Sequence, residues 1–315
     1  MCPWFRYRLA IITTNTEKYG CFNRQIFRST LLHGHFYARS SYVMMPPMLP
    51  GLLAIILYLL ASALLTVKLV RGIEPDRPRK QMCMIGLAAV IIHASLLYST
   101  LLTPEGLNLG IFHAASLVAM TTSLLLLLSM LVEPVENLGI AVFPLAAISI
   151  ALTLLYPEPH LITSAGSWQL ISHILASLLA YSIFGLAVLQ AILLAVQDSH
   201  LRNRSPGGFI RALPPLQTME SLLFQMIATG FVLLSLALIT GAVFLEDIFA
   251  QHLVHKTTLS IVAWCVFAVL LWGRWRFGWR GRTAIRWTIG GFIFLMLAYF
   301  GSKFVLELVL ANPAG

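Results

Sequence analysis

Long apolar runs dominate this chain, and short polar connectors separate them. Each run is about 20 residues long, which is the length that an α-helix needs to cross the hydrocarbon core of a bilayer. The connectors hold helix-interrupting residues such as Pro104, Pro134 and Pro206. The runs predict helices at Leu49–Val70, Met82–Leu102, Leu109–Val132, Leu138–Tyr156, Trp168–Gln197, Ser221–Leu245, Thr257–Arg274 and Trp287–Leu310. The pattern therefore predicts an all-α fold, a polytopic integral membrane helical bundle with about eight transmembrane helices.

Composition and charge exclude most other classes of protein. Hydrophobic residues make up 58% of the chain and charged residues only 10%, whereas a soluble domain usually carries about 25% charged residues. The net charge of +9 would suit nucleic acid, but the basic residues lie between the apolar runs and no nucleic-acid-binding motif occurs. The four cysteines form no CxxC pair, so we expect neither a zinc site nor dithiol chemistry. The partner that the composition predicts is the lipid bilayer.

The basic residues favour alternate connectors. The first, fifth and seventh connectors are rich in them, and these residues are Arg71, Arg77, Arg79, Lys80, Arg202, Arg204, Arg211, Arg274, Arg276, Arg280, Arg282 and Arg286. The second, fourth and sixth connectors together hold only Lys256. Since basic connectors stay on the cytoplasmic side of a membrane, we expect the odd connectors inside and the even connectors outside. Both ends of the helical core then face outward.

Residues 1–43 conflict with that orientation. They hold six basic residues although they precede an outward-facing helix start, and they lack the apolar stretch of about 7–15 residues that marks a signal peptide. Two explanations are open. The segment is a disordered basic tail, or it is a gene-model artefact and the true start is Met44, Met45 or Met48. We favour the second, which leaves residues 44–315 as the transmembrane domain.

Six of the nine histidines fall in the outer half of the predicted bundle, and these are His93, His113, His160, His173, His252 and His255. Ionisable side chains within a membrane are costly, and they usually face the bundle interior or a cavity. For His93 and His113, a functional role and a simple hydrogen bond to a neighbouring helix are both open. The connector residues His160 and His252 are more simply explained as solvated surface groups.

His173 is the strongest candidate for a functional residue. Ser177, Tyr181 and Phe184 follow it along one face of its helix, while the other faces are aliphatic. A histidine at the head of a polar and aromatic stripe suits a flat, hydrophobic ligand that contains a metal, such as haem, because histidine is a common axial ligand of haem iron. The simpler alternative is a packing seam between helices, and the pattern alone does not separate the two.

Motifs of the common hydrolytic and nucleotide-binding enzymes do not occur in this sequence. HExxH, GxSxG and a Walker loop are all missing, so we predict that the protein is not an enzyme. Trp272, Trp275 and Trp279 alternate with arginines at the inner end of the seventh helix, as in an aromatic belt with basic anchors. Glu220 lies at the start of the sixth helix, where an acid complements the helix dipole.

The second half of the chain resembles a known family. The resemblance rests on Leu213–Phe244, His255–Arg274 and Gly278–Val305, and within them on the order and spacing of TGAVF, LSIVAW, GWRGR and LAYFGS. These stretches resemble the cytochrome c assembly protein family, whose haem-handling members include the CcsA, ResC and HemX-like proteins. The likeness extends over roughly Leu49 to Leu310 and is strongest from Trp168 onward.

The resemblance implies a haem-binding or haem-handling protein of the bacterial inner membrane, with its haem site at the outer face. The characteristic histidine of the family, followed by leucine and tyrosine, matches His173 with Leu178 and Tyr181. Haem is thus the cofactor that the resemblance implies, and His173 is the expected iron ligand. We expect the second ligand to be one of His93, His113 and His255, and Tyr181 to line the cavity.

A second interpretation stays open. The tryptophan-rich external motif of the family is expected between Phe249 and Thr257, and of that motif this chain keeps only Lys256. A second family histidine would fall at Trp272, which is not a metal ligand. The alternative is an accessory or regulatory membrane protein that kept the fold but lost haem transfer, for example a partner of a transporter or of another membrane enzyme.

Overall fold

The structure is a computed structural model, and it describes residues 48–71, 76–103, 106–156, 161–162, 168–203, 213–244 and 251–301. All of them belong to the unit Met45–Gly315. The basic segment 1–43, and with it the question of the true start, lies outside the described residues.

The eight predicted membrane helices are confirmed, each long and apolar enough to cross a bilayer. They are α2 (Met48–Arg71), α3 (Asp76–Leu101), α4 (Ile111–Ser129), α5 (Gly139–Leu155), α6 (Trp168–Arg202), α7 (Leu216–Phe244), α8 (Gln251–Phe277) and α9 (Arg282–Met296). The last helix continues into η3 (Leu297–Gly301), one turn of π-helix. The all-α class predicted from the apolar runs is therefore confirmed.

Several helices extend past their apolar runs. The second helix, α3, begins at Asp76 rather than Met82, and the last, α9, begins at Arg282 rather than Trp287. A helix can continue into the headgroup region, because charged side chains are solvated there. A prediction from apolar residues alone therefore places the helix start too late. α6 has 35 residues and so extends for about 50 Å, beyond the roughly 30 Å of the hydrocarbon core.

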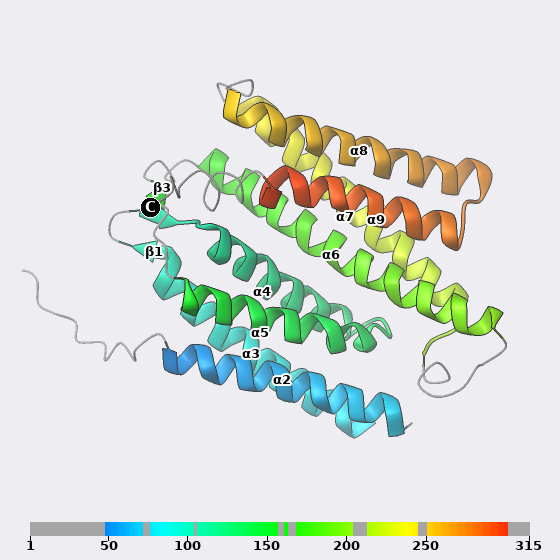
Figure 1. Ribbon diagram of the computed structural model, residues 1–315, viewed down its shortest axis with the longest axis horizontal. Helices are drawn as coiled ribbons and strands as arrows, with labels where there is room; N and C mark the ends of the chain where they lie inside the picture. Colours follow the sequence, from blue (N-terminus) through cyan, green and yellow to red (C-terminus); the bar gives the residue numbers. More distant parts are fainter. Residues whose placement is uncertain are drawn as a thin grey trace, which may run out of the picture. The chain divides into compact units, whose positions relative to one another are not determined.

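The helices form two groups with separate apolar cores. α2–α5 pack around one core, which also includes Leu186 of α6 and Leu222 of α7 and in which the rings of Tyr58 and Phe143 stack. α6–α9 pack around a second core, in which Phe184 of α6 stacks on Phe267 of α8 with ring centroids 3.9 Å apart. In Figure 1, α6 lies between α4 and the pair α7 and α9, and all three helices contact it. α6 therefore joins the two groups.

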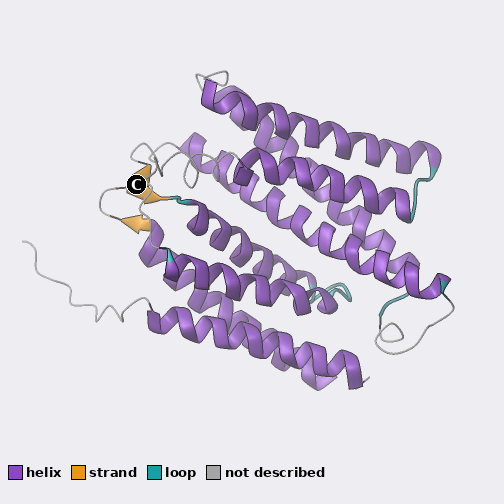
Figure 2. Ribbon diagram, in the orientation of Figure 1, coloured by secondary structure: helices purple, strands orange, loops and turns teal. Residues whose placement is uncertain are grey.

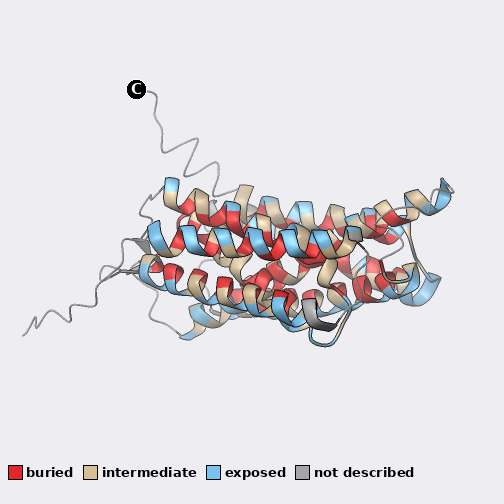
Figure 3. Cartoon of the chain, turned by 90° about the horizontal axis from the view of Figure 1, so that it is seen from below, coloured by how far each residue is buried: buried red, intermediate tan, exposed pale blue. Residues whose placement is uncertain are grey.

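Large apolar side chains remain exposed along the outside of the bundle. On α2, Ala54 and Tyr58 are fully buried, whereas neighbouring Leu53 and Ile56 are 48% and 60% exposed. Figure 3 shows the same alternation of buried and exposed positions along the helices. In water such a surface would drive aggregation, but in a bilayer it faces acyl chains. The exposed apolar residues are thus the lipid-facing side of a membrane bundle.

A small antiparallel sheet joins two connectors at one end of the helices. It consists of β1 (Leu102–Thr103), β2 (Gly106–Asn108) and β3 (Leu161–Ile162), drawn as orange arrows in Figure 2. Leu107 of β2 pairs with Ile162 of β3, which links the α3–α4 and α5–α6 connectors. We call this end the outer end, because it belongs to the even connectors.

An ion pair joins α2 to the α4–α5 connector at the opposite end. Lys68, near the end of α2, lies 2.6 Å from the carboxylate of Glu136 in the short 3-10 helix η1 (Glu136–Leu138). The α4–α5 connector, which has too few basic residues to assign by charge, is thereby tied to the end of α2. We call this the inner end, since it also carries the arginine-rich connectors.

Candidate functional site

The neighbouring helix fixes one ring nitrogen of His173. This residue lies five positions after the start of α6, which places it about 7.5 Å along the axis from the outer end of the helix. Its Nδ1 is 2.9 Å from the carbonyl oxygen of Ala237 and 3.4 Å from the hydroxyl oxygen of Thr240, both on α7. A carbonyl oxygen only accepts, so Nδ1 must carry the proton and donate. Nε2 then keeps its lone pair, and none of the described residues bonds to it.

The hydrogen-bond acceptors of His173 are themselves held in place. Ala237 is 3% exposed, within the contact between α6 and α7. The Thr240 hydroxyl donates to the carbonyl oxygen of Leu236 at 2.8 Å, which directs its lone pairs away from its own helix. The tautomer and the direction of the imidazole ring are therefore determined by backbone and side-chain contacts. Metal-ligating histidines usually have such support.

Aromatic side chains lie one turn deeper in the contact between α7 and α8. The indole nitrogen of Trp264 donates to the hydroxyl oxygen of Ser235 at 2.8 Å. Its ring stacks on Phe231 with centroids 5.2 Å apart. α7 therefore presents Ala237 to the histidine of α6 and, two residues earlier, Ser235 to the tryptophan of α8. The contact between Trp264 and Ser235 was not predicted from the sequence, because only the packing of α7 against α8 brings the two residues together.

Tyr181 binds the last helix through its hydroxyl group. The hydroxyl donates to the carbonyl oxygen of Leu295 on α9. Its ring lies edge-on to Tyr299 and Phe300 of η3, with centroids 5.9 and 6.3 Å away. The aromatic stripe that begins at His173 therefore meets an aromatic cluster on α9 and η3. Phe184, the last residue of that stripe, is fully buried in the α6–α9 core.

His93 is enclosed in the other helix group. Its ring is fully buried, with Nε2 2.8 Å from the Ser116 hydroxyl on α4 and Nδ1 3.3 Å from the Tyr58 hydroxyl on α2. Both ring nitrogens thus lie within hydrogen-bond distance of a hydroxyl group. The interhelical hydrogen bond that was open for His93 is present, and the structure does not bring this ring into contact with His173.

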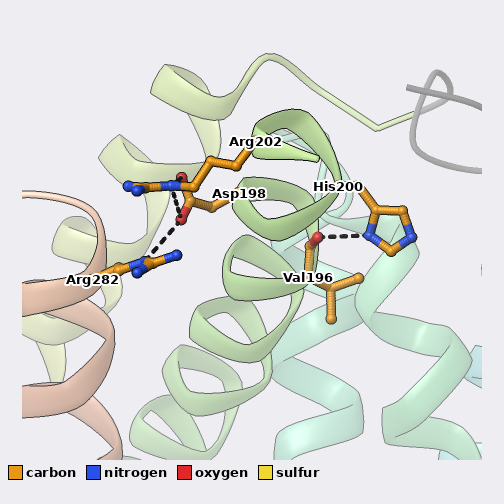
Figure 4. A network of polar contacts seen from close by, with 5 residues as sticks. All are labelled: Val196, Asp198, His200, Arg202 and Arg282. Atoms are coloured by element: carbon orange, nitrogen blue, oxygen red, sulfur yellow. Dashed lines mark hydrogen bonds and ion pairs between the residues drawn. The ribbon is translucent and has the colours of Figure 1, made fainter. Parts of the chain in front are cut away.

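The remaining histidines are distributed over both ends. His113 is 4% exposed near the outer end of α4, a helix that packs on α6. His255 lies in the first turns of α8, at the outer end, and its side chain is outside the described residues, as is all of His160. His200 lies at the inner end, where its Nδ1 donates to the carbonyl oxygen of Val196 at 2.9 Å (Figure 4).

Two carboxylates at the inner end each accept hydrogen bonds from two arginines. Asp198 of α6 binds Arg202 of the same helix and Arg282 of α9 (Figure 4). The two bonds measure 3.0 and 3.4 Å. Glu220 of α7 binds Arg274 of α8 at 2.6 Å, and it binds a further arginine from the α8–α9 turn at 3.0 Å. The role predicted for Glu220, favourable interaction with a helix dipole, omitted these partners, because they lie more than fifty residues away in the chain.

Among the described residues, no group of three or more histidine, cysteine, aspartate or glutamate side chains converges as a metal site. At the outer end, the His173 imidazole is oriented by its contacts with Ala237 and Thr240 of α7.

The comparisons with known proteins agree with the residue pattern. The model of the family described as cytochrome C assembly protein matches residues 83–310. The chain belongs to the cytochrome c assembly protein family. It is 33% identical to inner membrane protein YpjD of Escherichia coli strain K12 over 265 residues, which cover 82% of this chain and 98% of that protein. The predicted resemblance to the family is confirmed.

More distant relatives share part of the chain. Cytochrome c biogenesis protein CcsA of Gloeobacter violaceus is 29% identical over 103 residues, 32% of this chain and 30% of that protein. Protein HemX of Brevibacillus brevis is 22% identical over 134 residues, 42% of this chain and 49% of that protein. No solved structure matches the chain. With the eight spans and the likeness to an inner membrane protein, family membership shows a multi-pass protein of the bacterial inner membrane.

Proposed function

We propose that this protein binds haem at the outer face of the inner membrane and handles it in cytochrome c assembly. The observation that carries the proposal is the imidazole of His173. Its Nδ1 donates to the Ala237 carbonyl oxygen, and its Nε2 has a lone pair that none of the described residues occupies. The family and its members named for cytochrome c biogenesis support the same chemistry.

The residues around His173 fit a porphyrin better than a free metal ion. A free ion usually needs three or more protein ligands, and no such group occurs among the described residues. Haem iron needs only one or two axial ligands from the protein. Flat apolar side chains occur in the same helix group, Trp264 and Phe231 at the α7–α8 contact and Tyr299 and Phe300 in η3 beside Tyr181.

A second histidine of the outer half would complete the coordination of the haem iron. His113 lies near the outer end of α4, which packs on α6, and His255 lies at the outer end of α8, which packs on α7. His93 is the third candidate, and one of its contacts with the Ser116 and Tyr58 hydroxyls must break before it binds iron.

When bound, haem supplies an iron that coordinates imidazole and exchanges electrons. The protein has three tasks there. The Ala237 carbonyl oxygen holds the His173 ring in place and makes Nε2 a stronger electron donor by accepting a hydrogen bond from Nδ1–H. The aromatic side chains would offer apolar contacts to the porphyrin. The short distance of His173 from the outer end keeps the site within reach of an acceptor on that side.

The test is a spectrum of the full-length protein, purified from a haem-replete host. We expect a Soret band in the wild type and less than about a tenth of its haem content in His173→Ala, because the loss of an axial ligand removes a bond worth at least that factor. His200→Ala, which removes a histidine at the opposite end, should keep the wild-type ratio of haem to protein. His173→Gly should regain haem when imidazole is added, since a free imidazole then occupies the vacated position.

The alternative is an accessory or regulatory membrane protein that kept the fold without haem transfer. The observation that favours it is the sequence from Phe249 to Thr257, which keeps only Lys256 of the tryptophan-rich motif. The two proposals give opposite results in the same spectrum. A folded wild type without a Soret band, or equal haem content in wild type and His173→Ala, would refute haem binding at His173 and support the accessory protein.

A further inference from the structure

Positive charge exceeds negative charge at the inner end of the α6–α9 group. Six arginines of the described residues lie there, and these are Arg202, Arg274, Arg276, Arg280, Arg282 and Arg286. The carboxylates of the same helices, Asp198 and Glu220, each already bind two of them. Arg276 and Arg286 are exposed and pair with no carboxylate of the described residues. This end therefore has guanidinium groups available for an anion.

Large aromatic side chains are exposed at the same level. Trp272, Trp275 and Phe277, all in the last turns of α8, are 55%, 82% and 60% exposed. The membrane span of α8 ends at Phe277. Tryptophan and other aromatic rings favour the headgroup region, where one edge is hydrated and the rest contacts the upper acyl chain. Exposed rings at the end of a span therefore lie where lipid headgroups are found.

The α8–α9 turn, which lies beside these groups, has its own supporting contacts. Gly278 and Gly281 have φ angles of 65° and 52°, in the left-handed region that side chains disfavour. The Trp279 ring packs so closely on Gly273 that an added Cβ would lie 2.4 Å from it. Arg274 bonds both Glu220 and, at 3.2 Å, the carbonyl oxygen of Trp279. The turn is thus built before any ligand binds, which lowers the entropy cost of binding.

We propose that this surface, formed by the α8 end, the α8–α9 turn and the start of α9, binds an anionic phospholipid. The phosphate of the headgroup binds Arg276 and Arg286, and the glycerol and upper acyl region contact Trp272, Trp275 and Phe277. Guanidinium groups bind phosphate oxygens through paired hydrogen bonds. A zwitterionic headgroup carries its own cation into this positive field and binds more weakly. The exposed rings favour an amphiphile over a soluble anion.

The experiment measures binding of phosphatidylglycerol and phosphatidylcholine with identical acyl chains to the full-length protein in detergent, by native mass spectrometry. We expect the wild type to prefer phosphatidylglycerol. A basic residue near an anionic headgroup contributes roughly fivefold in affinity, so Arg276→Gln with Arg286→Gln should weaken phosphatidylglycerol binding about 25-fold. Phosphatidylcholine binding should stay as in the wild type. Both arginines are outside the carboxylate clusters, so the double variant should keep the wild-type fold, which circular dichroism checks.

Two control variants distinguish a specific lipid site from a general effect of positive charge. Lys80 is an exposed basic residue at the inner end of α3, in the other helix group, and Lys80→Gln should leave the preference unchanged. Trp275→Ala should lower the affinity for both lipids by the same factor, because it removes contact with the acyl region that the two lipids share. Equal affinity of the wild type for the two lipids would overturn the proposal. The proposal would also be overturned if Lys80→Gln weakened phosphatidylglycerol binding as much as the double arginine variant does. Displacement of phosphatidylglycerol by millimolar inorganic phosphate would overturn it too, because it would indicate a site for soluble anions.

Discussion

Replacing Glu220 with glutamine should destabilise the bundle far more than replacing Asp198 with asparagine. The two residues form a matched pair, since each carboxylate accepts from two arginines and ties α6 or α7 to later helices. They differ in burial. The Glu220 side chain is 6% exposed, and its partner Arg274 is 29% exposed. The Asp198 side chain is 22% exposed, and both of its arginines are 58% exposed.

The sizes of the two effects follow from that difference. A hydrogen bond to a charged group that is largely out of water is worth about 1.5–3 kcal/mol, and the 2.6 Å contact between Glu220 and Arg274 is of this kind. The second partner of Glu220 is 57% exposed and adds about 0.5 kcal/mol, as surface pairs do. We therefore expect Glu220→Gln to lower the free energy of unfolding by about 2–3 kcal/mol. Asp198→Asn loses only surface pairs and should cost about 1 kcal/mol or less.

The free energy of unfolding is measured by titration with sodium dodecyl sulfate in mixed micelles, followed by tryptophan fluorescence. Repeating it at about 0.5 M salt gives a second test, because salt screens exposed pairs more than buried ones. The effect of Asp198→Asn should then nearly vanish, while that of Glu220→Gln persists. Equal losses for the two variants, or a loss below about 0.5 kcal/mol for Glu220→Gln, would show that burial does not set the strength of these pairs.

Two further predictions concern packing and buried polar contacts. Gly273→Ala places a Cβ 2.4 Å from an indole ring and should cost about 1–3 kcal/mol through overpacking. Gly185→Ala meets nothing within 4 Å and should stabilise by up to about 1 kcal/mol, and thermal unfolding of both variants in detergent compares them. Around His93, Ser116→Ala removes a 2.8 Å contact and Tyr58→Phe a 3.3 Å contact. The serine variant should lose about 1 kcal/mol and the tyrosine variant about half as much, by the same measurement, and the reverse order would contradict the distances.

Much of the fold was predictable because the bilayer imposes a simple requirement. Backbone groups in hydrocarbon must bond within their own helix, so an apolar run of sufficient length has only one common structure. The ends of the helices were less predictable. α3 begins six residues before its apolar run because Asp76 and the basic residues after it stay helical in the headgroup region.

The small sheet β1–β3 was not predicted. Its strands have two or three residues each, and β2 and β3 lie more than fifty residues apart, so no local pattern indicates their pairing. The ion pairs of the inner end could not be predicted for the same reason. Glu220 and Arg274 were each visible as residues at helix ends, but their bond exists only because α7 and α8 pack side by side.

His173 illustrates both what the sequence predicts and what only the tertiary structure determines. Its place at the head of an aromatic stripe, and its match to the family, followed from the residues alone. That its Nδ1 faces the Ala237 carbonyl, while both nitrogens of His93 face hydroxyl groups, followed from tertiary packing. The length of an apolar run and the distribution of basic residues among the connectors are properties of the chain itself, so both can be read from the sequence. Which ring nitrogen of a histidine takes part in a hydrogen bond depends on atoms from other helices, and only the folded bundle brings those atoms together.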